Sequence, residues 1–306
     1  MKLKLAFIMI LVLTASVCFS QEYAVVLAGG GGKGAYQVGV WKALSEYGIA
    51  QKVSVISGTS VGGLNAALFS ITSAAEAEKI WTEQVSQKLT KDSSLISQKG
   101  LSELLDSIPL DEMRNSPVQV FVTAVRDRLK ALKFLKSKIL GAGAGSYTYY
   151  FKLNNDSKAG VKSKLLATSA FPVICDSVFV NDGEGGHYYS DGGEESVGGD
   201  NVPIKPIIEK FPHIKNIIVI YLSDKDHVAR RIPVKNYDKV NIIELFPSID
   251  LEGDGFFESI LDGTANFTET RIKLLLQKGY DDTVEYLQRK KMYPVSEYWF
   301  DKTETN

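Results

Sequence analysis

Cysteine is nearly absent from this chain, with two residues among 306. A small scaffold stapled by disulfides is therefore excluded, and stability must come from core packing. An excess of positive charge is also missing, because 35 Lys and Arg face 36 Asp and Glu. That balance argues against a basic nucleic-acid-binding protein. At 44% hydrophobic residues the chain is too apolar for a disordered protein, and its 26 glycines follow no strict period.

Long hydrophobic runs are missing except at the N-terminus, where two lysines precede the apolar run Leu5–Leu13. This run is too short to span a bilayer, which takes about 20 residues. The pattern predicts a secretory signal peptide over 1–20, cleaved after Ser20, and hence an exported protein, periplasmic or secreted. Lipidation at Cys18 and a plain membrane anchor are the alternatives. Cleavage would leave 33 basic against 36 acidic residues, Cys175 as the single cysteine, and no later segment that could cross a membrane.

The order of hydrophobic patterns indicates an α/β fold. Strands are expected over 23–28 and 53–56, each followed by a glycine-rich turn and then a helix, over 35–47 and 64–71. Strand and helix alternating in so few residues imply a parallel sheet with right-handed crossovers. Further strands are predicted over 118–125, 129–135, 146–153, 178–190 (interrupted by a turn), 214–222 and 240–245, and further helices over 74–90, 101–107, 161–170, 256–261 and 266–289.

The sequence Gly58-Thr59-Ser60-Val61-Gly62 lies between a predicted strand and a predicted helix. This is the context of a nucleophile elbow, in which a serine occupies a strained strand-to-helix turn. Gly58 and Gly62 would remove side chains that collide there, and the helix N-terminus would supply N–H groups and positive dipole. Ser60 is therefore a candidate nucleophile.

A second glycine-rich turn, Gly29 to Gly34 with Lys33, also joins a strand to a helix. A phosphate-binding P-loop would need glycine at position 27, which is leucine. The glycine spacing formally fits a dinucleotide fingerprint, but no acidic residue ends the second strand. The remaining interpretations are an oxyanion hole built from backbone N–H groups and a merely flexible loop. The two turns follow consecutive strands, so a parallel sheet can bring them side by side.

The third candidate is Asp191, followed by Gly192 and Gly193. A catalytic serine needs a proton acceptor, and none of the three histidines lies in an obvious motif. An aspartate on a tight turn could present its carboxylate to Ser60. Because aspartate is a weak base in water, that role would be helped by partial desolvation, which raises the pKa of a carboxyl group. A β-turn aspartate with a purely structural role is the alternative.

In this order, the three motifs resemble those of the patatin-like phospholipases, over roughly residues 23–206. Three further stretches support the resemblance: Gly34-Ala35-x-x-Val38-Gly39-Val40, Ala167-Thr168-Ser169-Ala170-Phe171-Pro172 and Asn201-Val202-Pro203. The resemblance implies a three-layer α/β sandwich with a mainly parallel central sheet flanked by helices. Residues 21–206 would form the catalytic part, and 207–306 would complete the same domain and end in helix.

The resemblance further implies a Ser–Asp dyad, with Ser60 as nucleophile and Asp191 as general base. Gly30, Gly31 and Gly32 would donate the oxyanion N–H groups. The implied reaction is hydrolysis of lipid or phospholipid acyl esters through an acyl-enzyme at a membrane or micelle surface, without metal or cofactor. Gln37 stands where many members carry histidine, which bears on the shape of the pocket.

Two other functions remain open on the sequence. An α/β-hydrolase triad would add His227, which follows the strand predicted over 214–222 in the correct chain order after Ser60 and Asp191. Only one strand precedes that of Ser60 in the mature chain, whereas that fold usually has several. A lipid-binding protein without turnover is the non-enzymatic alternative.

Overall fold

The structure is a computed structural model that describes residues 22–89, 97–126, 147–172, 175–193, 198–228, 231–251 and 264–295. The predicted signal peptide over 1–20, the strand predicted over 129–135 and the helix predicted over 256–261 lie outside these residues. Cys175 carries a free thiol.

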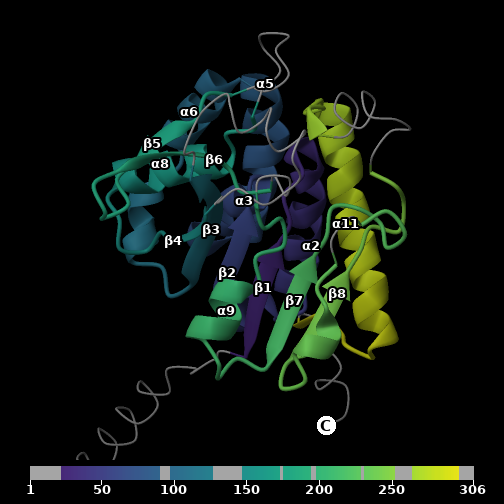
Figure 1. Cartoon of the computed structure of the whole chain (residues 1–306). Helices are drawn as coiled ribbons and strands as arrows, with labels where there is room; N and C mark the ends of the chain where they lie inside the picture. The colour runs from purple at the N-terminus through teal and green to yellow at the C-terminus, as the bar shows by residue number, and fades with distance from the viewer. Residues whose placement is uncertain are drawn as a thin grey trace, which may run out of the picture.

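The centre of the molecule is one eight-stranded sheet (Figure 1). Its order is β5-β6-β3-β2-β1-β7-β8, and β4 pairs with β3 off this path. Strands β1, β2, β3, β7 and β8 are parallel, and β4, β5 and β6 are joined by antiparallel pairing. The predicted mainly parallel sheet is therefore confirmed. The strands are β1 Tyr23–Leu27, β2 Val53–Thr59, β3 Gln119–Arg126, β4 Tyr147–Lys152, β5 Val178–Val180, β6 His187–Asp191, β7 Asn216–Ile220 and β8 Asn241–Leu245.

Helices flank this sheet (Figure 1). They are α2 Gly34–Glu46, α3 Val61–Ile71, α4 Ala74–Lys79, a π-turn η3 Ile80–Val85, α5 Ser86–Leu89, α6 Gln98–Ser107, α8 Lys158–Thr168, α9 Lys205–Lys210 and α11 Glu269–Arg289. Within the described ranges, none is long and apolar enough to cross a membrane.

Strand β1 shows why the sheet is covered on both faces. Successive strand side chains point to opposite faces, and all four residues from Ala24 to Leu27 are fully buried. Val25 and Leu27 join a core with α2, α3, α8 and α11, whereas Ala24 and Val26 join a second core with α9. A central strand of a parallel sheet must be apolar on both sides, which explains the continuous apolar run.

The C-terminal helix α11 packs directly on α2, and Figure 1 shows the two side by side. Their backbones touch at two glycines. A Cβ on Gly39 would come within 1.9 Å of the Leu276 carbonyl oxygen, and one on Gly279 within 2.0 Å of the Tyr36 carbonyl oxygen. The position of α2, which follows the glycine-rich loop, is thus fixed by the far end of the chain.

Candidate active site

Ser60 occupies a sharp bend between β2 and α3. Its φ of 54° and ψ of −127° are strained, and among the described non-glycine residues only Lys291 shares a positive φ. The turn predicted over 57–63 shrinks to this single residue, because β2 runs to Thr59 and α3 begins at Val61. The reason is close packing. A Cβ on Gly58 would meet the Gly62 carbonyl oxygen at 2.2 Å, and one on Gly62 would meet the Leu27 carbonyl oxygen at 2.3 Å.

Hydrogen bonds fix the backbone of the bend on both sides. The Ser60 carbonyl oxygen accepts from the N–H groups of Gly63 (2.9 Å) and Leu64 (3.1 Å), which starts the helix. The Ser60 N–H donates to Thr168 Oγ1 at 2.9 Å, and that hydroxyl donates to the Thr123 carbonyl oxygen. Ser60 is thus held as a nucleophile elbow requires, with its side chain on the cavity described below.

The register of β3 brings the end of β6 that carries Asp191 next to the end of β2 that leads into Ser60. On this strand Thr123 pairs with Thr59 of β2, and the next residue, Ala124, pairs with Asp191 of β6. Since β4 occupies one edge of β3 over this stretch, β2 and β6 share the other edge end to end. Neighbouring positions on a strand are about 3.3 Å apart. Thr59, the last residue of β2, and Asp191, the last residue of β6, therefore pair with neighbouring residues of β3 and lie next to each other.

The Asp191 carboxylate is nearly buried, with 4% of the residue exposed. The backbone N–H of Asp191 donates to the Ala170 carbonyl oxygen at 2.9 Å. The carboxylate oxygen Oδ1 accepts from the Gly193 N–H at 2.7 Å. A Cβ on Gly192 would lie 2.3 Å from the Thr123 carbonyl oxygen. The two predicted glycines therefore turn the chain tightly against β3, directly after the aspartate.

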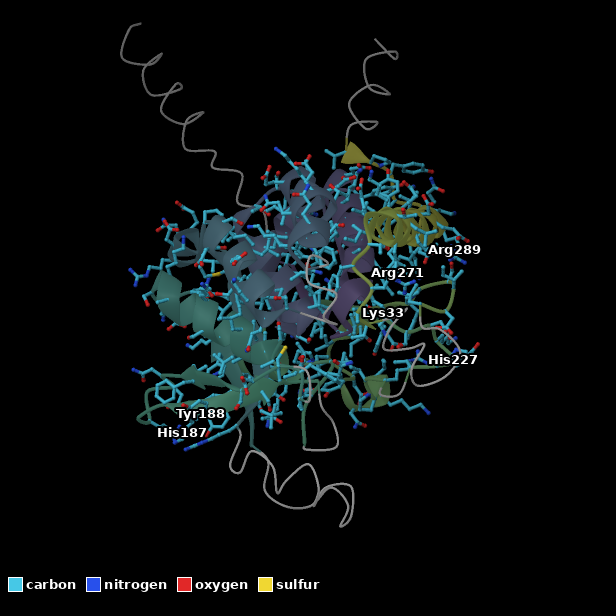
Figure 2. All side chains as sticks on the ribbon, turned by 90° about the horizontal axis from the view of Figure 1, so that it is seen from above. Lys33, His187, Tyr188, His227, Arg271 and Arg289 are labelled. Carbon is cyan, nitrogen blue, oxygen red and sulfur yellow. The ribbon has the colours of Figure 1, made fainter. Side chains whose placement is uncertain are left out.

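A buried carboxylate anchors the hairpin that carries Asp191. The Asp182 side chain accepts from Tyr189 Oη at 2.6 Å and is paired with His187 Nδ1 at 2.5 Å. Burial by itself raises the pKa of Asp182, but these hydrogen bonds and two backbone N–H groups outweigh it and lower that pKa below its ordinary range. The anchor lies at the edge of the molecule, where Figure 2 labels His187.

The glycine-rich loop forms a short 3-10 turn over Gly31–Lys33. The Gly29 N–H is engaged by Asn201 Oδ1 at 3.0 Å and is not available to a ligand. In the described part of the chain, the N–H groups of Gly30, Gly31 and Gly32 meet no acceptor. An oxyanion hole would need free donors of this kind, and the role predicted for Gly30, Gly31 and Gly32 stays a prediction.

Both ends of this loop are tied by a buried polar network. Gln37 Nε2 donates to the Ala28 carbonyl oxygen at 2.8 Å, and Asn65 Nδ2 donates to the Gly34 carbonyl oxygen at 3.0 Å. Asn65 also donates to Gln37 Oε1 and accepts from the Trp81 indole N–H, both at 2.9 Å. Gln37 and Asn65 are fully buried. Buried networks with every group satisfied fix a single geometry, and this one sets the loop relative to α3.

Replacing Asn65 by alanine is expected to lower kcat for ester hydrolysis about tenfold with little change in KM, because the glycine loop loses its anchor. The free energy of unfolding should fall by about 1–3 kcal/mol, since the Trp81 N–H and Gln37 Oε1 lose their partner. Trp81→Phe, which removes the indole N–H together with part of the ring, should change kcat in the same direction. Steady-state kinetics and thermal melts test this, with the exposed Asn236→Ala as control. Equal changes in both Asn variants would contradict it.

A connecting segment joins all three motifs. Asn201 binds Gly29, the Asp200 carbonyl oxygen accepts from Thr59 Oγ1 at 2.7 Å, and the Asp200 N–H donates to the Gly192 carbonyl oxygen at 2.8 Å. Sequence reasoning assigned no role to these two residues. Asn201 could have been singled out from the stretch Asn201-Val202-Pro203, which was used only for the family resemblance.

Residues from all three motifs line one cavity of about 310 Å³. It is lined by Ser60, Asp191, Gly29, Gly30, Gly31, Lys33 and Asn201, together with many apolar side chains. In Figure 2, Lys33 lies toward the middle of the molecule. Among the described residues no hydrogen bond joins Ser60 to Asp191, and Gly32 is not part of the lining. Gly34, Gly58, Gly62 and Gly192 pack against backbone or core side chains instead.

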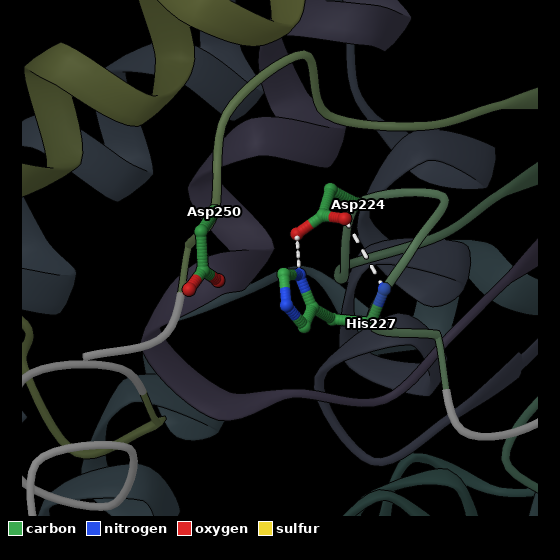
Figure 3. Close-up of side chains that lie close together, drawn as sticks. All are labelled: Asp224, His227 and Asp250. Carbon is green, nitrogen blue, oxygen red and sulfur yellow. Dashed lines mark hydrogen bonds and ion pairs between the residues drawn. The ribbon is translucent and has the colours of Figure 1, made fainter. Parts of the chain in front are cut away.

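His227 is not brought to this cavity. Its side chain is 68% exposed and is paired with Asp224, at 2.7 Å from Nδ1 to Oδ2 (Figure 3). The hydrogen bond to Asp224 raises the pKa of His227. Asp250 lies on the other side of the ring, and the three residues offer ligand atoms within 4.8 Å of one another. Exposed acidic groups of this kind are common without a metal, and a raised pKa favours the protonated imidazole, which cannot bind one.

The sequence over residues 25–208, more than half of the chain, matches the family model of patatin-like phospholipases. The chain belongs to the patatin-like phospholipase family. VipD from Legionella pneumophila has a similar structure, with a TM-score of 0.50 and 14% identity over 88% of this chain and 67% of that one. For the type III effector protein ExoU the TM-score is 0.42, with 14% identity over 89% and 53%. No curated protein sequence matches significantly. The likeness to VipD concerns the fold, and the family supports a lipid hydrolase.

Proposed function

We propose that this patatin-like protein is a serine lipid acyl hydrolase, of phospholipase A or esterase type, that uses a Ser60–Asp191 dyad. The observation that carries the proposal is the register on β3, where Thr59, the residue before the strained Ser60, and the nearly buried Asp191 pair with consecutive residues. Gly30 and Gly31, whose N–H groups meet no acceptor among the described residues, line the same cavity.

In this mechanism, Ser60 Oγ attacks the ester carbonyl carbon while its proton passes to the Asp191 carboxylate. The negative oxygen of the tetrahedral intermediate accepts hydrogen bonds from the N–H groups of Gly30 and Gly31, which line the cavity. Breaking of the C–O bond releases the alcohol, which takes the proton from Asp191, and leaves an acyl ester on Ser60. Asp191 then deprotonates a water that attacks this ester. The acyl carbon–Oγ bond breaks, Ser60 Oγ takes the proton back from Asp191, and the fatty acid is released.

The proposal places the substrate at a membrane or micelle surface, because the acyl chains of lipids gather there. An exported location, periplasmic or secreted, is part of the proposal and depends on the N-terminal segment 1–20. With a net charge near zero, contact with a lipid surface would depend on apolar side chains around the cavity more than on bulk electrostatics.

A fluorophosphonate probe tests for the nucleophile directly, since it phosphonylates activated serines far faster than ordinary hydroxyl groups. Peptide mass spectrometry should place one label on Ser60, and Ser60→Ala should take up none. Absence of labelling in the folded wild-type protein would favour the non-catalytic lipid-binding alternative.

A further inference from the structure

The cavity continues from Ser60 into a region walled by apolar helix residues. Helix α3 contributes Leu64 and Leu68 to the wall. The continuous helical segment from Ala74 to Leu89 contributes Trp81, Val85 and Leu89. No charged side chain from these helices lines the cavity within the described residues, so this region suits a hydrocarbon.

A π-turn aligns the residues of the second wall. In a regular α-helix, residues four apart drift by about 40° around the axis, so Trp81 and Leu89 would be turned by about 80°. The wider π-turn over Ile80–Val85 offsets this drift, and Trp81, Val85 and Leu89 all reach the cavity. Single π-turns inside helices are frequent at functional sites. Hydrogen bonding to Asn65 fixes the Trp81 ring.

Helix α6 supplies a third wall, with Leu101, Leu104 and Leu105. These leucines are only 3–5% exposed. Helix α6 packs on α5 and α8, and Figure 1 shows α5 and α6 beyond the upper end of α3. The buried leucines of α6 therefore form one boundary of the apolar part of the cavity.

We infer that this region binds a single extended acyl chain of the substrate and that the α6 leucines set the longest chain accepted. The inference rests on the proposed function, because it assigns the acyl group attacked by Ser60 to this region. The volume of about 310 Å³ is near the lower end for ligand pockets. It suits one chain, so the rest of a lipid would stay outside the protein.

The test combines turnover and binding. Wild type, Leu104→Trp and Leu104→Ala are assayed on saturated p-nitrophenyl esters from acetate to palmitate. Leu104→Trp should lower kcat/KM for the longest esters about tenfold or more, as expected when about two methylenes lose their buried contacts. Acetate hydrolysis should change less than about twofold. Leu104→Ala should move the optimum to longer chains. Leu274→Trp, at a leucine that is 55% exposed on α11, is the matched control.

Binding of free saturated fatty acids to Ser60→Ala, with and without each Leu104 substitution, tests the inference independently of catalysis. Titration calorimetry should show the same shift in preferred length. An unchanged length profile in both Leu104 variants, or a uniform loss for all lengths, would overturn the inference. If the binding profile shifts while wild type hydrolyses no ester, the proposed function fails and the assignment of the acyl region stands.

Discussion

Ser60→Ala is expected to abolish ester hydrolysis, with kcat reduced about 10⁴-fold or more, because the acyl-enzyme can no longer form. Release of fatty acid from phospholipid vesicles and turnover of a short p-nitrophenyl ester both measure the loss. The fold should be retained, since alanine keeps the backbone hydrogen bonds at this position. Ser163→Ala, on α8 and outside the cavity, should keep full activity.

Glycine at the same position gives a second readout. Ser60→Gly should be equally inactive but more stable than wild type by about 1 kcal/mol or more, because glycine adopts a positive φ without strain. Thermal melts measure the difference. A residual activity of Ser60→Ala within tenfold of wild type would contradict the serine mechanism. A Ser60→Gly variant less stable than wild type would contradict backbone strain at this position.

Asp191→Asn is expected to lower kcat about 10³-fold to 10⁴-fold, in the range by which a general base contributes. The amide has the size of the carboxylate, and its oxygen can still accept from the Gly193 N–H. It cannot take the proton of Ser60. The melting temperature should therefore change little while fluorophosphonate labelling of Ser60 slows strongly. Fatty acid release and labelling rates are the measurements.

His227→Ala is the matched test of the triad alternative. Since His227 is mostly exposed and paired with Asp224, its removal should leave kcat within about twofold of wild type. A collapse of activity comparable to that of Ser60→Ala would overturn the dyad in favour of a triad. Full activity in Asp191→Asn would remove the aspartate from the mechanism.

Much of the fold could be predicted because its signals are local. The apolar run of β1 and the periodicity of α2 and α11 predicted these elements to within a few residues. The Ser60 turn was predicted too wide, over 57–63. Its glycines signal a tight turn in the sequence, but its length is decided by how closely Gly58 and Gly62 approach neighbouring backbone.

The networks around the site could not be predicted, because each joins residues far apart in the chain. Asn201 reaches Gly29 across 172 positions, and the Ser60 N–H reaches Thr168 across 108. An asparagine or a threonine has no local pattern that names its partner. The same limit applies to Asp182, whose burial follows from the packing of the hairpin it anchors.

The sequence by itself determined the strands that lie in the described residues, the order of the motifs and the candidate residues: Ser60, Asp191 and the glycine loop. These follow from short-range spacing and from the conformations that glycine permits. Only the tertiary structure decided that Thr59 and Asp191 share one edge of β3, and that His227 lies away from the cavity with Asp224. The physical reason is strand register, since pairing between distant segments places side chains that no local pattern can relate.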